Sequence, residues 1–239
     1  MYQYKNRVAY SQIDQRGTIG ISQVVDAMQD ACMFHCTEVG RSCMDLKAEN
    51  RAWLVSSWHI QFHHLPQMGE EYLISTWPYK VKGVFSFRNV ILESLEGEAI
   101  ACGDSAWFFY DQENNKPVRI PEKEKAYYEM KPPYEMDYAS RKVACPRDEL
   151  VLTQEVSVCQ NYLDTNDHVN NGQYVRLAVN VLPKDFEAGE LRAEFRNAAR
   201  LGDVLYIRTG ERDGMFYTVF TDRDGQPYFL AEWKRKQGE

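Results

Sequence analysis

The sequence has few of the features that mark membrane, secreted or nucleotide-binding proteins. No apolar run reaches the roughly 18–20 residues needed to cross a bilayer. The first seven residues are polar and lack the apolar core of a signal peptide. There is no GxGxxG motif, no Walker loop and no GxSxG nucleophile elbow. We therefore expect a cytoplasmic protein that does not insert into membranes and uses no cofactor.

The sequence also offers little for a metal or a disulfide. Its six cysteines include no CxxC pair, and Cys32 and Cys36 stand four residues apart, a spacing that suits packing on one helix face. His63 and His64 would face opposite sides of a strand, and no carboxylate or cysteine completes a ligand set. We expect reduced, mostly buried cysteines and no metal site.

Positive charge is the third deficit. The chain has 28 Lys and Arg against 35 Asp and Glu, a net charge of -7, which argues against nucleic-acid binding. An acidic protein partner would need a local basic patch. The 239 residues allow one large domain or two of about 120 residues, and either can bury a core.

The hydrophobic pattern of the first half predicts one long helix and a set of strands. A short strand is expected at 7–10. A helix is expected from about Ser22 to Val39, with Ser22 as N-cap and Gly40 as the C-terminal stop. Period-two alternation then predicts strands at 53–62, 71–79, 84–92 and 99–110. A helix followed by antiparallel strands indicates an α+β fold.

Residues 111–149 interrupt this rhythm with prolines and charges, and they hold one short helical segment near 122–129. The same order of elements then returns. We expect a strand at 152–159, a helix at about 171–182, and strands at 190–197, 204–211, 216–222 and 228–235. The predicted organisation is a first domain at 1–121, a linker at 122–149 and a second domain at 150–239.

The two halves also match residue by residue. At an offset of 150, Asp14 falls on Asp164, and Gln23 and Val25 fall on Gln173 and Val175. At an offset of 133, matches between the strands are Phe62 with Phe195, Gly69 with Gly202, Ile74 with Ile207 and Thr76 with Thr209. The shared order indicates an internal duplication.

One polar turn stands out as the candidate site. The stretch from Leu163 to Tyr174 holds Asp164, Asn166, His168 and two further asparagines, and an amphipathic helix follows at once. The N–H groups of the first helical turn are unpaired and carry partial positive charge, so they can polarise a carbonyl oxygen. The alternative is that Asn170 or Asn171 only caps the helix and His168 is an ordinary turn residue.

The pattern Asp-x-Asn-x-His-Val-Asn-Asn, with Tyr174 two residues later, resembles the active-site signature of hotdog-fold thioesterases. Further pieces resemble the acyl-ACP thioesterases of plants and bacteria. These are Ser75-Thr76-Trp77-Pro78, Phe87-Arg88-Asn89, the stretch from Gly97 to Trp107, and Pro117-Val118-Arg119-Ile120-Pro121. The resemblance implies a tandem (double) hotdog, in which each half is a long helix wrapped by a bent antiparallel β-sheet. The two sheets would join edge to edge.

The resemblance also implies a division of roles. At the positions of Asn166, His168, Asn170 and Asn171 the first half has Arg16, Thr18, Gly20 and Ile21, so the chemistry is expected in the second half. The first half would hold the acyl chain between helix and sheet, with Met28, Cys32 and Trp53 as candidate lining residues; plain core packing is the alternative.

Arg192, Arg196 and Arg200 recur every four residues, which predicts that they share one face of an extended strand. We expect this face to contact the carrier or its phosphate; the alternative is a solvated face.

The mechanism expected from the turn is hydrolysis. Backbone N–H groups of Val169, Asn170 and Asn171 would polarise the thioester carbonyl. Asn166 and His168 would orient water, and Asp164 would take its proton directly or through His168.

One departure from the family bears on the general base. The family has an acid, and plant members a cysteine, at positions that fall on Ala198 and Ala199. Asp164 or His168 would then activate the water. Glu194 is a third candidate, but it lies four strand residues, about 13 Å, from Ala198.

The leading hypothesis is hydrolysis of acyl-acyl-carrier-protein to free fatty acid, with acyl carrier protein as partner. The alternatives are an acyl-CoA thioesterase of the same fold and a non-catalytic acyl-thioester sensor or binding protein. A hotdog dehydratase fits the asparagine-rich turn poorly. Chain-length preference is left open, as is a homodimer.

Overall fold

The computed structural model of the chain describes residues 1–236, and the chain separates into two compact units. The first unit is Met1–Tyr138, and the second begins at Ala139. The boundary falls inside the segment 122–149 that the sequence predicts as a linker. Among the described residues, no helix is both long enough and apolar enough to span a membrane.

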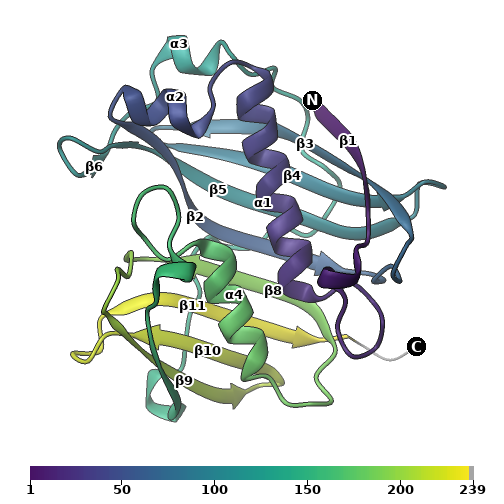
Figure 1. The fold of residues 1–239 in the computed structure, drawn as a ribbon, viewed down its shortest axis with the longest axis vertical. Coiled ribbons are helices and arrows are strands. Elements are labelled where there is room, and N and C mark those ends of the chain that lie inside the picture. The colour runs from purple at the N-terminus through teal and green to yellow at the C-terminus, as the bar shows by residue number, and fades with distance from the viewer. Residues whose placement is uncertain (237–239) are drawn as a thin grey trace. The chain divides into compact units, whose positions relative to one another are not determined.

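The first unit packs one long helix on an antiparallel sheet (Figure 1). The helix α1 is Ile21–Glu38. The strand order is β1 (Tyr2–Arg7), β3 (Glu71–Lys82), β4 (Phe85–Ser94), β5 (Ala99–Asp111) and β2 (Arg51–Phe62), and the short β6 (Lys116–Pro117) pairs with β5. Two short helices, α2 (Cys43–Ala48) and α3 (Glu122–Lys125), and a 3-10 turn at Tyr10–Gln12 complete it.

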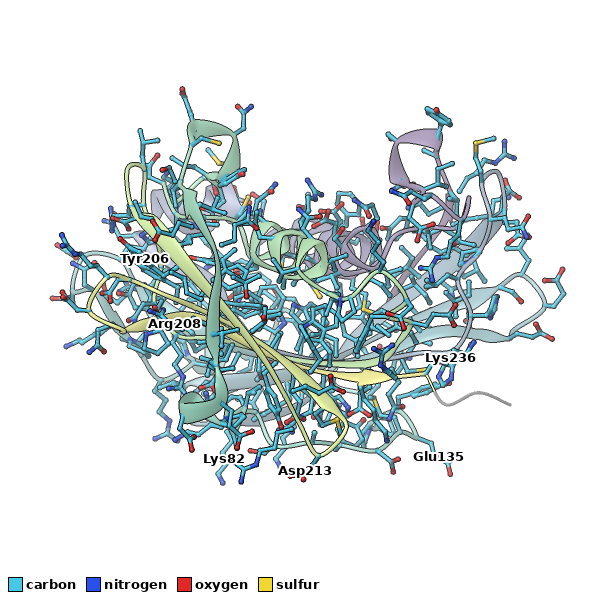
Figure 2. The ribbon with its side chains drawn as sticks, turned by 90° about the horizontal axis from the view of Figure 1, so that it is seen from below. Lys82, Glu135, Tyr206, Arg208, Asp213 and Lys236 are labelled. Carbon is cyan, nitrogen blue, oxygen red and sulfur yellow. The ribbon has the colours of Figure 1, made fainter. Side chains whose placement is uncertain are left out.

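The second unit repeats this plan with a shorter helix (Figure 1). Here α4 (Asn171–Asn180) accompanies strands in the order β8 (Ala188–Phe195), β11 (Pro227–Arg235), β10 (Met215–Thr221), β9 (Val204–Arg212) and β7 (Val151–Ser157). Single 3-10 turns lie at Arg147–Glu149 and Gln160–Tyr162. The β9–β10 turn uses Asp213 and Gly214, both at positive φ, as a tight hairpin requires (Figure 2).

The structure corrects two local predictions and adds one helix. The first strand is Tyr2–Arg7, because the exposed and half-buried residues that alternate there pair with β3, and the chain turns at Tyr10. The N-cap of α1 is Gly20, and Ser22 is buried inside the helix. The helix α2 was missed. It is too short to show periodicity, but Ser42 and Asp45 form a capping box that marks its start.

In the first unit the two sheet faces have different partners. Alternate residues of β4 point to opposite sides. Arg88 contacts α1 through His35. Its neighbour Asn89 faces the other way and accepts hydrogen bonds from the Tyr134 N–H and the Tyr138 hydroxyl, both at 3.0 Å. Segment 132–138 is therefore fastened to the outer face of this sheet by a side chain that is fully buried.

We expect Asn89→Ala to lower the free energy of unfolding by at least about 2 kcal/mol, because it strands buried hydrogen-bonding groups. It should also expose segment 132–138 to proteolysis. Denaturant unfolding and limited proteolysis measure the two effects. Asn89→Asp keeps the accepting oxygen but loses the Nδ2–H that donates to the Gly103 carbonyl at 3.3 Å, so it should restore only part of the protection. Equal protease resistance of Asn89→Ala and the wild type would contradict this account.

Candidate active site

The polar turn that precedes α4 is organised by the carboxylate of Asp164. Its Oδ1 accepts the N–H of Asn166 at 2.8 Å and, more weakly, that of His168 at 3.4 Å. The Asp164 N–H in turn donates to the carbonyl of His168 at 2.8 Å. Asp167 adopts the left-handed conformation, φ 58°, which closes the turn. The three predicted catalytic side chains thus lie on one compact loop.

Only one of the three predicted oxyanion N–H groups is available. The Val169 N–H donates to the Ala199 carbonyl at 2.9 Å, and the Asn170 N–H donates to the Tyr162 carbonyl at 2.8 Å. Asn170 is the N-cap, and its Oδ1 accepts the Gly172 N–H. For the Asn171 N–H, at the first position of α4, the described residues supply no hydrogen-bond acceptor. The prediction for Val169 and Asn170 is therefore wrong, and the Asn171 N–H is the one of the three that stays a candidate.

His168 is half-buried beside charges of both signs. Burial lowers its pKa below the ordinary value, and the nearby Arg200 guanidinium lowers it further, while Asp164 and Asp167 oppose this shift. The imidazole is consequently neutral at neutral pH and can accept a proton. Within residues 1–236 its ring forms no hydrogen bond to Asp164. A direct relay from water through His168 to Asp164 would therefore need a rearrangement or a bridging water.

The first unit contains the same turn with Arg16 and Thr18 in place of Asn166 and His168, and both side chains contact the Asp14 carboxylate. Asp14 Oδ1 accepts the Arg16 N–H at 2.8 Å, and the Asp14 N–H donates to the Thr18 carbonyl at 2.8 Å. Gly17, at φ 79°, stands where the second unit has Asp167. The Ile19 N–H donates to the Pro66 carbonyl at 2.9 Å, as Val169 donates to Ala199. The acid is shared because it builds the turn, whereas His168 and Asn166 are additions of the second unit.

Ala199, one of the two positions at which the resemblance leads us to expect an acid or a cysteine, contacts this turn. Ala199 is fully buried and receives the Val169 N–H on its carbonyl, while its own N–H donates to the Tyr174 hydroxyl at 3.0 Å. Glu194 is also buried, but its carboxylate accepts the Val143 N–H and pairs with Arg196. Its neighbour Phe195 contacts Tyr174 of α4, so Glu194 points to the opposite sheet face and cannot act as the base here.

The three arginines predicted on one strand face do not share a strand. β8 ends at Phe195, so Arg196 and Arg200 lie beyond it, and Arg200 begins a turn in which its N–H donates to Asp203. Arg192 pairs with Glu232 at 2.7 Å and donates to the carbonyls of Ser140 and Lys142. The spacing of four was extended past the end of the strand, and the predicted basic face is wrong.

Of the three predicted acyl-binding residues of the first unit, two line a cavity and one does not. Cys32 and Trp53 line a cavity of about 40 Å³ between α1, the sheet and the α3 segment. Met28 does not line it. Met28 is fully buried against Gly103, where an added Cβ would lie 3.1 Å from the Met28 sulfur, so Met28 belongs to the core.

The same cavity contains polar side chains that the sequence analysis did not single out as functional. Arg88, Glu124 and Tyr128 all line it. The sequence signal for these polar side chains was Arg88, a charged residue at a strand position that faces the core. Among residues 1–236, no cluster of three or more His, Cys, Asp or Glu side chains is placed to hold a metal ion.

The fold and the turn are those of an α+β protein with a polar helix start, and comparison with known families specifies the family. The model of the acyl-ACP thioesterase N-terminal domain matches residues 1–128, and that of the C-terminal domain matches residues 147–223. The chain belongs to the acyl-ACP thioesterase family.

Relatives in sequence are distant. The chain is 22% identical to an acyl-[acyl-carrier-protein] hydrolase, named as chloroplastic, from Cuphea viscosissima, over 79% of this chain and 49% of the relative. It is also 22% identical to a palmitoyl-acyl carrier protein thioesterase, named as chloroplastic, from Cuphea hookeriana, over 92% of this chain and 59% of the relative. The chain thus spans about half the length of these curated relatives.

Solved structures agree on the fold. An acyl-ACP thioesterase from Bacteroides thetaiotaomicron matches with a TM-score of 0.87 at 18% identity, over 98% of this chain and 97% of that one. The 12:0-ACP thioesterase from Umbellularia californica matches with a TM-score of 0.83 at 16% identity, over 98% and 96%. The chain accordingly has an α+β fold of hotdog type.

We expect NMR titration of the His168 imidazole to give a midpoint below 6.5, the ordinary value. Arg200→Gln should raise the midpoint, because it removes the cation, and Asp167→Asn should lower it. A midpoint unchanged by both substitutions would contradict this electrostatic description.

The lowered pKa also affects stability. The unfolded chain takes up the proton first as pH falls, so the contribution of His168 is intact above about pH 6.5 and declines as pH falls through that value. The unfolding free energy of His168→Gln should therefore fall less than that of the wild type between pH 7 and 5.

Proposed function

We propose that this protein hydrolyses the thioester of acyl-acyl-carrier-protein and releases free fatty acid. Membership of the acyl-ACP thioesterase family supports the substrate class. The observation that carries the proposal is the turn before α4, where a neutral His168 and Asn166 accompany the Asn171 N–H, and these two side chains have no counterpart in the first unit. The same turn in the first unit has Arg16 and Thr18 at the positions of Asn166 and His168, although α1 also begins with an N–H, that of Ile21, for which the described residues supply no acceptor.

In the proposed mechanism the thioester carbonyl lies at the start of α4. The Asn171 N–H, strengthened by the helix dipole, stabilises the developing oxyanion. Asn166 and His168 orient the attacking water. Because its pKa is lowered, His168 is available to accept a proton at neutral pH. Asp164 fixes the turn through Oδ1, and its other oxygen takes the proton of the attacking water, directly or through His168. The C–S bond then breaks, and this proton leaves on the thiol while the acyl group is released as the acid.

The two units would then have separate roles within a tandem hotdog. The second carries out the chemistry, and the first holds the acyl chain in the cavity lined by Cys32 and Trp53. A cavity of about 40 Å³ exceeds the space of one water but is far too small for a long chain, so a long acyl group requires the lining to move. Flexible side chains at its edge, such as Met33 and Met130, suit that movement.

A second candidate is hydrolysis of acyl-CoA at the same site. The pairing of Arg192 with Glu232 and of Arg196 with Glu194 favours it, because both reduce the positive surface that an acidic carrier would need. Carrier docking should weaken steeply with salt, and CoA recognition less so. A non-catalytic sensor is the third candidate. The homodimer and the cytoplasmic location stay predictions.

The first test is release of free thiol from matched acyl-ACP and acyl-CoA substrates. We expect the wild type to hydrolyse acyl-ACP and His168→Ala to lose at least ~10²-fold in turnover while still folded. A loss below tenfold would remove His168 from the mechanism. Tight binding of substrate without turnover in either protein would instead identify an acyl-thioester sensor.

A matched pair of variants separates the two roles of Asp164. Asparagine retains the oxygen that holds the turn, so Asp164→Asn and Asp14→Asn should both fold normally. We expect Asp164→Asn to lose at least ~10²-fold in turnover and Asp14→Asn less than about threefold. Similar small effects at both positions would mean that Asp164 only builds the turn and that another group is the base.

A further inference from the structure

A buried arginine without an acidic partner lies inside the first unit. Arg88 of β4 is 7% exposed. Its Nη1 donates to His35 Nδ1 at 2.8 Å and to Thr76 Oγ1 at 3.2 Å, and the guanidinium lies over the Tyr128 ring, 5.6 Å from its centre. Across residues 1–236 the structure records no ion pair for Arg88. The guanidinium charge is therefore not neutralised by direct contact.

The groups that touch Arg88 or lie beside it are neutral. Burial and the Arg88 charge lower the pKa of His35 to about 3, so its ring is an uncharged acceptor at neutral pH. Burial raises the pKa of Cys32 to about 12 and also raises that of Cys36, so both thiols keep their protons. Burial likewise raises the pKa of the Tyr128 phenol. None of them supplies a negative charge.

The carboxylate that lines the cavity is already paired with another arginine. Glu124 lines the same cavity, but its carboxylate binds Arg41 at 2.9 Å and the Trp53 indole N–H at 3.3 Å. Arg41 also pairs with Glu49. In the first unit, the buried Arg41 therefore has two carboxylate partners and the buried Arg88 has none among the described residues. A buried cation that lacks an anion is costly, so an unfilled anion position beside Arg88 is the simplest explanation.

The space beside Arg88 suits the end of an aliphatic chain. Besides Arg88, the cavity is lined mainly by apolar side chains, among them Val81, Trp107 and Ile120. Its volume of about 40 Å³ is several times the ~10–15 Å³ that one water needs by the same measure, enough for a carboxylate and an adjoining methylene. Met130, 46% exposed, lies at its open side.

We propose that this cavity binds the carboxylate of an aliphatic acid, held by the Arg88 guanidinium. The carboxylate has two sources: a free fatty acid, which is the product of the proposed hydrolysis, or the far end of an acyl chain that carries a terminal carboxyl group. Binding itself does not depend on the proposed function, whereas the identity of the source does.

The test measures binding of decanoate and of 1-decanol to the full-length protein by calorimetry, with the fluorescence of Trp53 and Trp107 as a second readout. We expect decanoate to bind at least ~10-fold more tightly than decanol, because hydrogen bonds to a charged group are the stronger kind. Arg88→Met should remove this preference. Arg88→Gln keeps a donor for His35 and serves if the methionine variant does not fold.

Arg208→Met is the matched control. Arg208 of β9, labelled in Figure 2, is a half-buried arginine of the second unit that donates to Thr221 at 2.7 Å. Its removal should leave the preference for decanoate unchanged. Equal affinity of the wild type for decanoate and decanol would overturn the proposal. So would a preference that persists in folded Arg88→Met or Arg88→Gln.

A second comparison distinguishes the sources. Decanoyl thioester and the monothioester of decanedioic acid are offered as substrates. Faster hydrolysis of the decanedioic thioester in the wild type, lost in Arg88→Gln, would assign the site to a carboxyl-ended acyl chain. Inhibition by decanoate without that rate difference would assign it to the free acid. If neither thioester is hydrolysed, the proposed function fails while the binding result stands.

Discussion

The rest of the structure depends on one hydrogen bond that occurs once in each unit, in which an aspartate carboxylate oxygen accepts a backbone N–H. Oδ1 of Asp14 and Oδ1 of Asp164 each accept an N–H two residues ahead and so fold the chain into a tight turn. The turn delivers the start of a helix to a fixed place beside the sheet, because the next residues bond to carbonyls of the strand connection. Without this oxygen, neither helix would begin where it does.

The repeated turn separates structure from chemistry. Where both halves keep a residue, packing or backbone geometry explains it: an aspartate for the turn, and Gly69 and Gly202 at the same φ of 88°. Where they differ, the second half has Asn166 and a half-buried His168, and the first half has Arg16 and Thr18. The first half instead has a longer helix, 18 residues against 10, and a cavity beneath it. One architecture thus presents a helix start flanked by a histidine and an asparagine in one copy and a helix side with space below it in the other.

Much of this could be read from the sequence, and the failures have physical reasons. Period-two alternation placed the long strands to within a few residues, and the polar turn identified the candidate site. The run Arg192, Arg196 and Arg200 misled because spacing alone does not reveal that a strand ends at Phe195. The sequence does not show that the N–H groups of Val169 and Asn170 are bonded to backbone carbonyls, so it predicted too many candidate oxyanion donors. The contact of Arg88 with His35 spans 53 residues, and no local pattern encodes it.

Tyr174 gives the second unit a further property. Its ring is stacked on Phe229, and its hydroxyl accepts the Ala199 N–H, while the Ala199 carbonyl accepts the Val169 N–H. Helix, turn and strand connection are thereby closed into one ring of contacts around a buried aromatic side chain. Such a corner lacks a hinge of its own, so it does not fray independently of the unit around it. Opening of the turn and loss of tertiary structure should therefore be one cooperative event in this unit.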